Sequence, residues 1–290
     1  MSTRKVTLSA ICGVLLTTML AGPVSAAKPA RPSPEASAER PLTAEELAAA
    51  ERKIAASDAY LASVESGGLD LVTLSCATPT GAGAQAETQA CAVPQGFLSV
   101  EARDQTKAHY CGPATGQVIA NYSWAVGAGA NKYTQAKIAG WMQTDVFGRT
   151  NAPELEDGLE LGTQGSPRRP AGWDWVVADV RDRDGDGHSG DELQGYVRSN
   201  VSGSKMPLAI PVKPHDAHSD YYLISWPKPV ASVGHWIAAY GWYGNYTGTT
   251  FARIYYTDSS RDEGGSTGKF WDPTRDIAAL IAEHTRRIVW

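Results

Sequence analysis

Cys111 is the residue in this chain best placed to act as a nucleophile. The run Cys111-Gly112-Pro113 opens a segment in which Ala114, Val118 and Tyr122 recur every four residues, and proline favours the first turn of a helix. Unpaired backbone N–H groups and the positive end of the dipole at a helix N-terminus favour thiolate over thiol. This position therefore predicts nucleophilic catalysis. The alternative is a buried cysteine that starts a core helix.

His235 is the histidine best placed to act as a base on this thiol. It lies in a predicted strand, residues 234–240, and a second predicted strand, residues 252–258, ends at Asp258. A hairpin that turns after Tyr246 places His235 opposite Asp258, with Cβ atoms roughly 5 Å apart. Asp258 would then accept the Nδ1 proton of His235 and fix its tautomer. A β-bulge would shift this register by one residue.

The other histidines are weaker candidates. His109 lies two residues before Cys111, which is poor geometry for a hydrogen bond to that thiol, so we place it in the wall of the site. Two histidines and two aspartates within residues 215–220 are more typical of a solvated polar loop than of a metal site. His284 is expected in a C-terminal helix that begins near Pro273.

A segment that begins at Asp182 fits the opening of a calcium-binding loop, with carboxylates at positions 1, 3 and 5 and glycine at position 6. The usual loop closes with glutamate at position 12, whereas Leu193 stands there in this chain and Glu192 holds position 11. An exposed Asp/Gly turn is an equally good interpretation. The candidate calcium ligands are Asp182, Asp184, Asp186, Glu192 and, through its backbone carbonyl, His188.

The N-terminus has the pattern of a secretory signal peptide. Arg4 and Lys5 precede an apolar stretch that ends in small residues, and the stretch is too short and too rich in Ser, Thr and Gly for a membrane anchor. We therefore expect residues 1–26 to be a signal peptide and the protein to be secreted and extracellular, without an integral membrane segment. Residues 27–42, rich in Ala, Pro and Ser, are expected to be a linker or pro-segment.

The cysteine count fits this export. Signal cleavage removes Cys12 and leaves Cys76, Cys91 and Cys111. Cys76 and Cys91 flank a loop without helical or strand pattern, so they are the expected disulfide, which would contribute roughly 3 kcal/mol. Cys111 is then left as the free thiol.

The expected linker is followed by an N-terminal helical segment and then by a larger domain. Thr43 and Glu46 have the spacing of a capping box and precede a helical run that reaches Ser66. We expect a packing helix there, and an inhibitory pro-helix over the active site is the less favoured alternative. Residues 43–100 thus form a helical and disulfide-containing segment, and residues 101–290 a single α+β domain with an Asp-rich insertion at about 180–195.

Composition excludes other classes of protein. The 290 residues are 42% hydrophobic, which rules out disorder for most of the chain, and 26 basic against 31 acidic side chains give a net charge of −5. No Lys/Arg run exceeds a pair, so we expect no nucleic-acid partner.

The motif residues together resemble a known family. Residues 105–114, Gly234-His235-Trp236 and Tyr256-Thr257-Asp258 resemble the bacteriocin-leader (double-glycine) peptidase-like family of papain-like cysteine peptidases, in its stand-alone secreted form. The resemblance runs from about Gln105 to the C-terminus. It implies the following roles: Cys111 as nucleophile, His235 as general base, Asp258 as its orienting partner and Gln105 as an oxyanion-hole donor.

The resulting expectation is a papain-like α+β fold, with the nucleophile helix packed on an antiparallel β-sheet. The expected function is hydrolysis of a peptide or protein substrate by a secreted cysteine peptidase through a thioester intermediate. Catalysis would need no cofactor, and calcium would have a structural role. Two alternatives stay open: a cell-wall amidase or transpeptidase with the same triad, and a non-catalytic, calcium-stabilised surface-binding domain.

Overall fold

The computed structural model describes residues 39–66, 94–144, 149–185, 189–215, 220–227, 233–245, 252–260 and 264–290. The predicted signal peptide, the predicted linker up to residue 38 and both cysteines of the predicted disulfide lie outside these ranges. No helix within them has the length and apolar character needed to cross a lipid bilayer.

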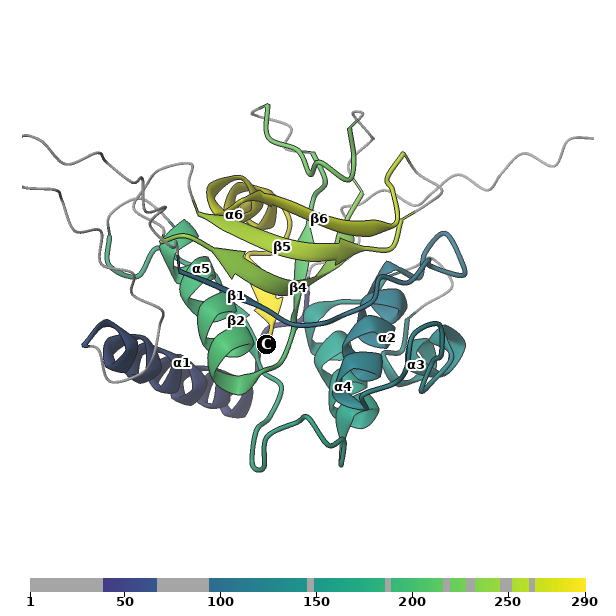
Figure 1. The fold of residues 1–290 in the computed structure, drawn as a ribbon, viewed down its shortest axis with the longest axis horizontal. Coiled ribbons are helices and arrows are strands. Elements are labelled where there is room, and N and C mark those ends of the chain that lie inside the picture. Colours follow the sequence, from purple (N-terminus) through teal and green to yellow (C-terminus); the bar gives the residue numbers. More distant parts are fainter. Residues whose placement is uncertain are drawn as a thin grey trace, which may run out of the picture. The chain divides into compact units, whose positions relative to one another are not determined.

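The described chain contains both helices and strands, with three consecutive helices within residues 111–163 and four consecutive strands within residues 208–273 (Figure 1). The helices are α1 (Ala44–Glu65), α2 (Cys111–Ser123), α3 (Gln135–Trp141), α4 (Ala152–Thr163), α5 (Gly190–Arg198), the π-helical turn η2 (Ser199–Ser204) and α6 (Thr274–Ala282). The strands are β1 (Gln95–Phe97), β2 (Val177–Asp179), β3 (Leu208–Val212), β4 (His235–Tyr243), β5 (Arg253–Asp258), β6 (Gly268–Pro273) and β7 (Arg287–Val289).

The described strands form one antiparallel sheet in the order β2-β7-β3-β4-β5-β6, and β1 pairs with β4 beside this path. Helix α2 packs on β4 and carries α3 and α4, whereas α5 and α6 pack on each other and on the same sheet. The predicted α+β class, with a helix starting at the cysteine and packed on an antiparallel sheet, is therefore confirmed.

Strand β4 lies at the centre of the sheet and positions the site. All its residues from His235 to Trp242 are buried, so both of its faces are covered. On one side Thr115 of α2 donates a 3.0 Å hydrogen bond from its hydroxyl to the carbonyl of Trp236. This contact fixes the first turn of α2 against the first residues of β4.

The helix ends follow local sequence signals. Thr43 and Glu46 form the predicted capping box at the start of α1, and α2 begins at Cys111 as expected. Helix α6 follows Pro273 directly. The prediction that His284 belongs to that helix is wrong, because the helix ends at Ala282 and His284 lies in the turn that leads into β7.

The predicted register of the β4–β5 hairpin is wrong by two residues. Ala238 pairs with Thr257, and continuing this register places Asp258 opposite Ile237 instead of His235. Side chains alternate between the faces of a sheet with a period of two. A shift of two therefore leaves His235 and Asp258 on the same face, as diagonal neighbours within reach of each other.

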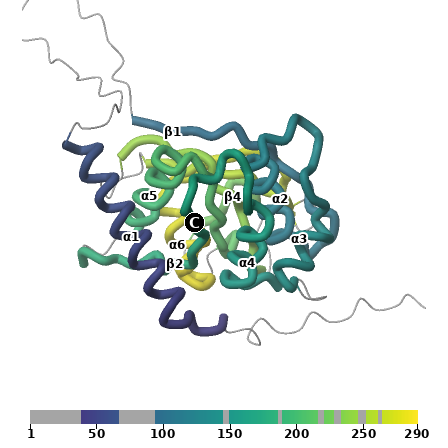
Figure 2. Tube along the Cα trace, turned by 90° about the horizontal axis from the view of Figure 1, so that it is seen from below, coloured from purple at the N-terminus to yellow at the C-terminus, as the bar shows by residue number. Residues whose placement is uncertain are grey.

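Helix α1 packs against α5, β2 and η2. Figure 2 shows it on the side of the fold that carries α5 and β2, whereas α2 and α3 lie on the other side. Its Ser57 hydroxyl donates a buried 2.8 Å hydrogen bond to Ser199. The segment 43–100 therefore contributes a helix to the packing and, through β1, a strand to the sheet.

Candidate active site

The structure brings Cys111, His235 and Asp258 together from three elements. Cys111 is the first residue of α2, His235 the first residue of β4 and Asp258 the last residue of β5. The imidazole Nε2 lies 2.8 Å from Asp258 Oδ1, and the side chain of Cys111 lies close enough to the imidazole to raise the pKa of His235. Three residues that are far apart in sequence thus form a continuous Cys–His–Asp chain of contacts.

The sequence prediction assigned the wrong imidazole nitrogen to Asp258. Nε2 faces the carboxylate, so Nδ1 is the nitrogen left for the Cys111 side. Either ring nitrogen can donate or accept a hydrogen bond, depending on the tautomer. Asp258 therefore still orients the imidazole, although it faces Nε2 instead of Nδ1.

Burial and charge act against each other at this pair. The side chain of His235 is 3% exposed and that of Asp258 is 0% exposed. Burial by itself lowers the pKa of His235, but the charge and hydrogen bond of Asp258, with a smaller effect of Cys111, raise it to about 10. Burial likewise opposes ionisation of Asp258, and the facing imidazolium lowers its pKa overall. The geometry therefore favours an imidazolium–carboxylate pair.

Asp258 also accepts hydrogen bonds from three further groups. The backbone N–H of Ser260 donates to Oδ1, and the hydroxyl of Ser225 and the indole N–H of Trp226 donate to Oδ2, each at 2.8 Å. The Trp226 ring also meets the His235 ring at an angle of 62°, with centroids 5.0 Å apart. Sequence reasoning missed Ser225 and Trp226, because they follow no motif and reach the site only through the tertiary fold.

A second buried carboxylate supports the Ser225 side of the site. Tyr256 donates a 2.6 Å hydrogen bond from its hydroxyl to Asp272, and Tyr256 and Ser225 hydroxyls lie 3.2 Å apart. Asp272 also accepts a hydrogen bond from the backbone N–H of Ile224, and burial raises its pKa to about 6. This network holds the segment that carries Ser225 and Trp226 over strands β5 and β6.

Gln105 lies beside the Asp258 segment. Its backbone N–H donates to the Ser259 carbonyl at 3.0 Å, and its side-chain amide donates to the Ala108 carbonyl at 2.8 Å. A primary amide has two hydrogens, so one remains for a further acceptor. Gln105 is buried, and its Oε1 has no hydrogen-bond partner among the described residues.

Gln135 of α3 holds the loop that leads to Cys111. Its Oε1 accepts a 2.8 Å hydrogen bond from the backbone N–H of Thr106, and its Nε2 donates to the Asp104 carbonyl at 2.7 Å and to Gln117 at 3.0 Å. Gln135 is 3% exposed. The backbone on both sides of Gln105 is therefore tied to α2 and α3.

The remaining histidines have different environments. His109 is partly buried, with its ring edge against Tyr110. His284 is partly buried next to Gly234, and burial, followed by the charges of Lys213 and His235, lowers its pKa to about 4. His215 stacks on Tyr222. Its predicted loop neighbours at positions 216 to 219 lie outside the described residues.

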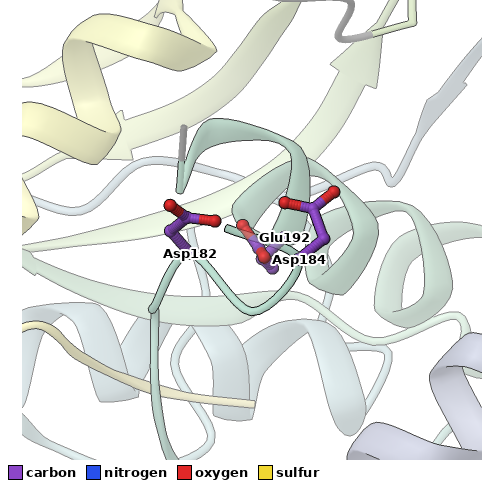
Figure 3. A group of neighbouring side chains, drawn as sticks. All are labelled: Asp182, Asp184 and Glu192. Carbon is purple, nitrogen blue, oxygen red and sulfur yellow. The ribbon is translucent and has the colours of Figure 1, made fainter. Parts of the chain in front are cut away.

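The predicted calcium ligands are described only in part. Asp182, Asp184 and Glu192 each offer a carboxylate oxygen, and these oxygens lie within 4.8 Å of one another (Figure 3). Asp186 and His188 lie outside the described residues. Burial, followed by the neighbouring Asp191, raises the pKa of Glu192 to about 7.

Comparison with known proteins identifies no family: no protein-family model matches the chain, and no curated protein matches it either. Function is therefore argued from the geometry of the site.

Proposed function

We propose that this protein is a secreted cysteine peptidase of papain-like fold, similar to the bacteriocin-leader peptidase-like family. The observation that carries the proposal is the chain of contacts from Cys111 through His235 to Asp258. A nucleophile that contacts a base, which is in turn oriented by a third group, is the arrangement that covalent acyl transfer requires.

In the proposed reaction, Cys111 Sγ attacks the carbonyl carbon of the scissile peptide bond. A C–S bond forms, the C–N bond breaks, and the His235 imidazolium gives its proton to the leaving amine. Water then attacks the thioester while His235 accepts a water proton, so the acid product leaves and the thiolate is regenerated. Asp258 keeps the imidazole oriented through both steps.

Stabilisation of the oxyanion is assigned to two donors. Cys111 is the first residue of α2, and the first N–H groups of a helix have no partner within the helix. The second donor is the remaining amide hydrogen of Gln105. Two such donors directed at the developing negative charge would stabilise the transition state by several kcal/mol.

Access to the site supports this assignment. Cys111 is partly exposed, whereas His235 and Asp258 are buried behind it. A substrate would therefore reach the sulfur while water is kept from the charged pair. The signal-peptide pattern of residues 1–26 supports an activity outside the cell, and the proposed substrates are peptides or proteins.

The test is hydrolysis of a mixed peptide library by the purified full chain and by Cys111→Ala. We expect the variant to fold and to lose turnover to below about one part in a thousand. Iodoacetamide should modify Cys111 of the parent protein and abolish its activity, because alkylation removes the proposed nucleophile.

Two histidine variants provide matched controls. His235→Gln should be as inactive as Cys111→Ala, whereas His109→Gln, changed two residues before the nucleophile, should keep most of the activity. Turnover that survives in Cys111→Ala would assign the nucleophile elsewhere. Fast thiol labelling without cleavage of any library peptide would instead indicate acyl transfer on a different class of amide.

A further inference from the structure

Three carboxylates gather at the N-terminal end of α5, away from the Cys–His–Asp contacts. Asp182 and Asp184 are exposed in the segment before the helix, and Glu192 is buried in its first turn. Figure 3 shows the Glu192 carboxylate between those of Asp182 and Asp184. Like charges this close repel each other, so a bound cation would stabilise the cluster.

Glu192 provides an independent indication of a ligand. Glu192 is 8% exposed, and its carboxylate oxygen Oε2 is buried without a hydrogen-bond partner among the described residues. Oε1 accepts a 2.6 Å hydrogen bond from the backbone N–H of Arg183. That bond turns the carboxylate toward the acidic segment. A buried carboxylate oxygen without a partner is costly, and a cation would satisfy it.

The positive side chain of Arg183 lines a pocket beside the cluster and pairs with a carboxylate outside the cluster. The guanidinium of Arg183 forms an ion pair with Asp58 of α1, at 3.0 Å. The pocket has a volume of about 360 Å³ and is lined by residues of α1, α5 and the acidic segment, including Asp184, Asp191 and Glu192. An ion therefore has both a negative environment and an open route from solvent.

The distances and chemistry fit calcium. Calcium binds oxygen ligands at about 2.3–2.6 Å, so two oxygens on one ion are at most about 5 Å apart. The observed spread, within 4.8 Å, lies inside this limit. Calcium also tolerates irregular geometry and water ligands, whereas magnesium requires a near-ideal octahedron.

We propose that Asp182, Asp184 and Glu192 bind one calcium ion, which fastens the acidic segment to helix α5. Glu192, at position 11 of the loop, is the ligand that replaces the glutamate found at position 12 of the usual calcium-binding loop. The ion also stabilises the wall of the pocket that α1 shares with α5. The site is independent of the peptidase chemistry.

The test is calorimetric titration of the full chain with CaCl₂ after removal of bound metal with EGTA, together with the thermal midpoint with and without CaCl₂. We expect one calcium per chain, a rise in the midpoint and much weaker binding of MgCl₂. Asp184→Asn removes one ligand carboxylate at an exposed position. It should raise the calcium Kd at least about tenfold.

Glu51→Gln is the control. It removes one exposed negative charge of α1 that acts on Tyr196 in the pocket lining, but none of the three ligand carboxylates, so the Kd should change less than about threefold. Glu192→Gln, checked for folding by circular dichroism, should lose calcium binding. Equal effects of Glu51→Gln and Asp184→Asn would reduce the cluster to general charge attraction, and absence of calcium binding by the parent chain would overturn the proposal.

Discussion

Asp258 accepts four hydrogen bonds, from His235, Ser225, Trp226 and the Ser260 backbone. Two donors serve each carboxylate oxygen, which keeps the buried group ionised although burial opposes its charge. The indole ring also covers one side of the imidazole. These contacts fix both the charge and the direction of the His235 ring.

The types and spacing of Cys111, His235 and Asp258 could be predicted because helix starts and strand alternation are local signals. The ring nitrogen that faces Asp258 could not be predicted, since it depends on how α2 approaches β4. Ser225 and Trp226 could not be predicted either. They lie in a segment without regular structure whose position is set by Asp272 and Tyr256 on the far side of the site.

Asp258→Asn tests the orienting role. Asparagine keeps the size of the side chain but removes the negative charge that stabilises the His235 imidazolium, so turnover at saturating substrate should fall more than about tenfold. Asp276→Asn changes a partly buried carboxylate of α6 that pairs with Arg275, and should lower turnover less than about threefold. Circular dichroism checks the fold of both. Equal turnover in the two variants would remove Asp258 from the proposed triad.

The same pair predicts how stability depends on pH. The pKa of His235 is raised from 6.5 to about 10, so its contribution is complete below about pH 6.5 and is lost as the pH rises toward 10. The pKa of Asp258 is lowered from 3.8, so its contribution is complete above about pH 4 and is lost as the pH falls further. The free energy of unfolding of the parent chain should exceed that of Asp258→Asn most between these limits.

Urea unfolding of both proteins at about pH 5, 8 and 10 measures this difference. We expect it to shrink from the first pH to the last. A difference that stays constant over this range would mean that the pair is not ionised in the folded protein.

At the scale of elements, the hairpin of β4 and β5 shows that the sheet face of a residue can be predicted more easily than its exact pairing partner. The predicted pairing assumed a turn after Tyr246 and no irregularity. The structure has a β-bulge between Ala239 and Gly241 and a register near the site that differs by two residues. The correct face was predicted because a shift of two preserves the alternation, and a shift of one would have separated His235 from Asp258.

The loop before α2 depends on a helix from another part of the chain. Gln135 of α3 binds the backbone of Asp104 and Thr106, which lie on either side of Gln105. No local pattern indicates this contact, because the partners are separated by about thirty residues. The element that positions the proposed oxyanion donor is therefore visible only in the folded chain.

Gln135→Ala should weaken the proposed catalysis through this loop. It leaves the backbone N–H of Thr106 and the carbonyl of Asp104 without their part-buried partner, which costs about 1 kcal/mol of unfolding free energy, and it frees the segment that holds Gln105. We expect kcat to fall about tenfold. Gln164→Ala, at the exposed end of α4, should change neither quantity. If Gln135→Ala is destabilised but keeps its kcat, the loop that holds Gln105 does not contribute to the catalytic step.

At the scale of the whole molecule, α1 is joined to the rest of the fold by a partly buried lysine. Lys53 donates hydrogen bonds to the carbonyls of Asp174 and Trp290 and lies 3.6 Å from the centre of the Trp173 ring. Burial lowers its pKa well below the usual range. Its partners are 121 and 237 residues away along the chain, so the capping box predicts the helix but not where it packs.

Lys53→Ala should therefore destabilise the described fold as a unit. The change removes two hydrogen bonds and a cation–π contact and leaves a cavity between α1 and the strands beyond it, so the free energy of unfolding should fall by about 2 kcal/mol or more. Lys132→Ala is the matched control, because Lys132 lies 3.7 Å from the centre of the Trp124 ring but is exposed, and its loss should cost less than about 1 kcal/mol. Thermal unfolding followed by both circular dichroism and tryptophan fluorescence should give coincident transitions that shift together in Lys53→Ala. If the helical signal shifts alone while the fluorescence transition stays in place, α1 unfolds separately and is a removable segment, as the pro-helix alternative requires.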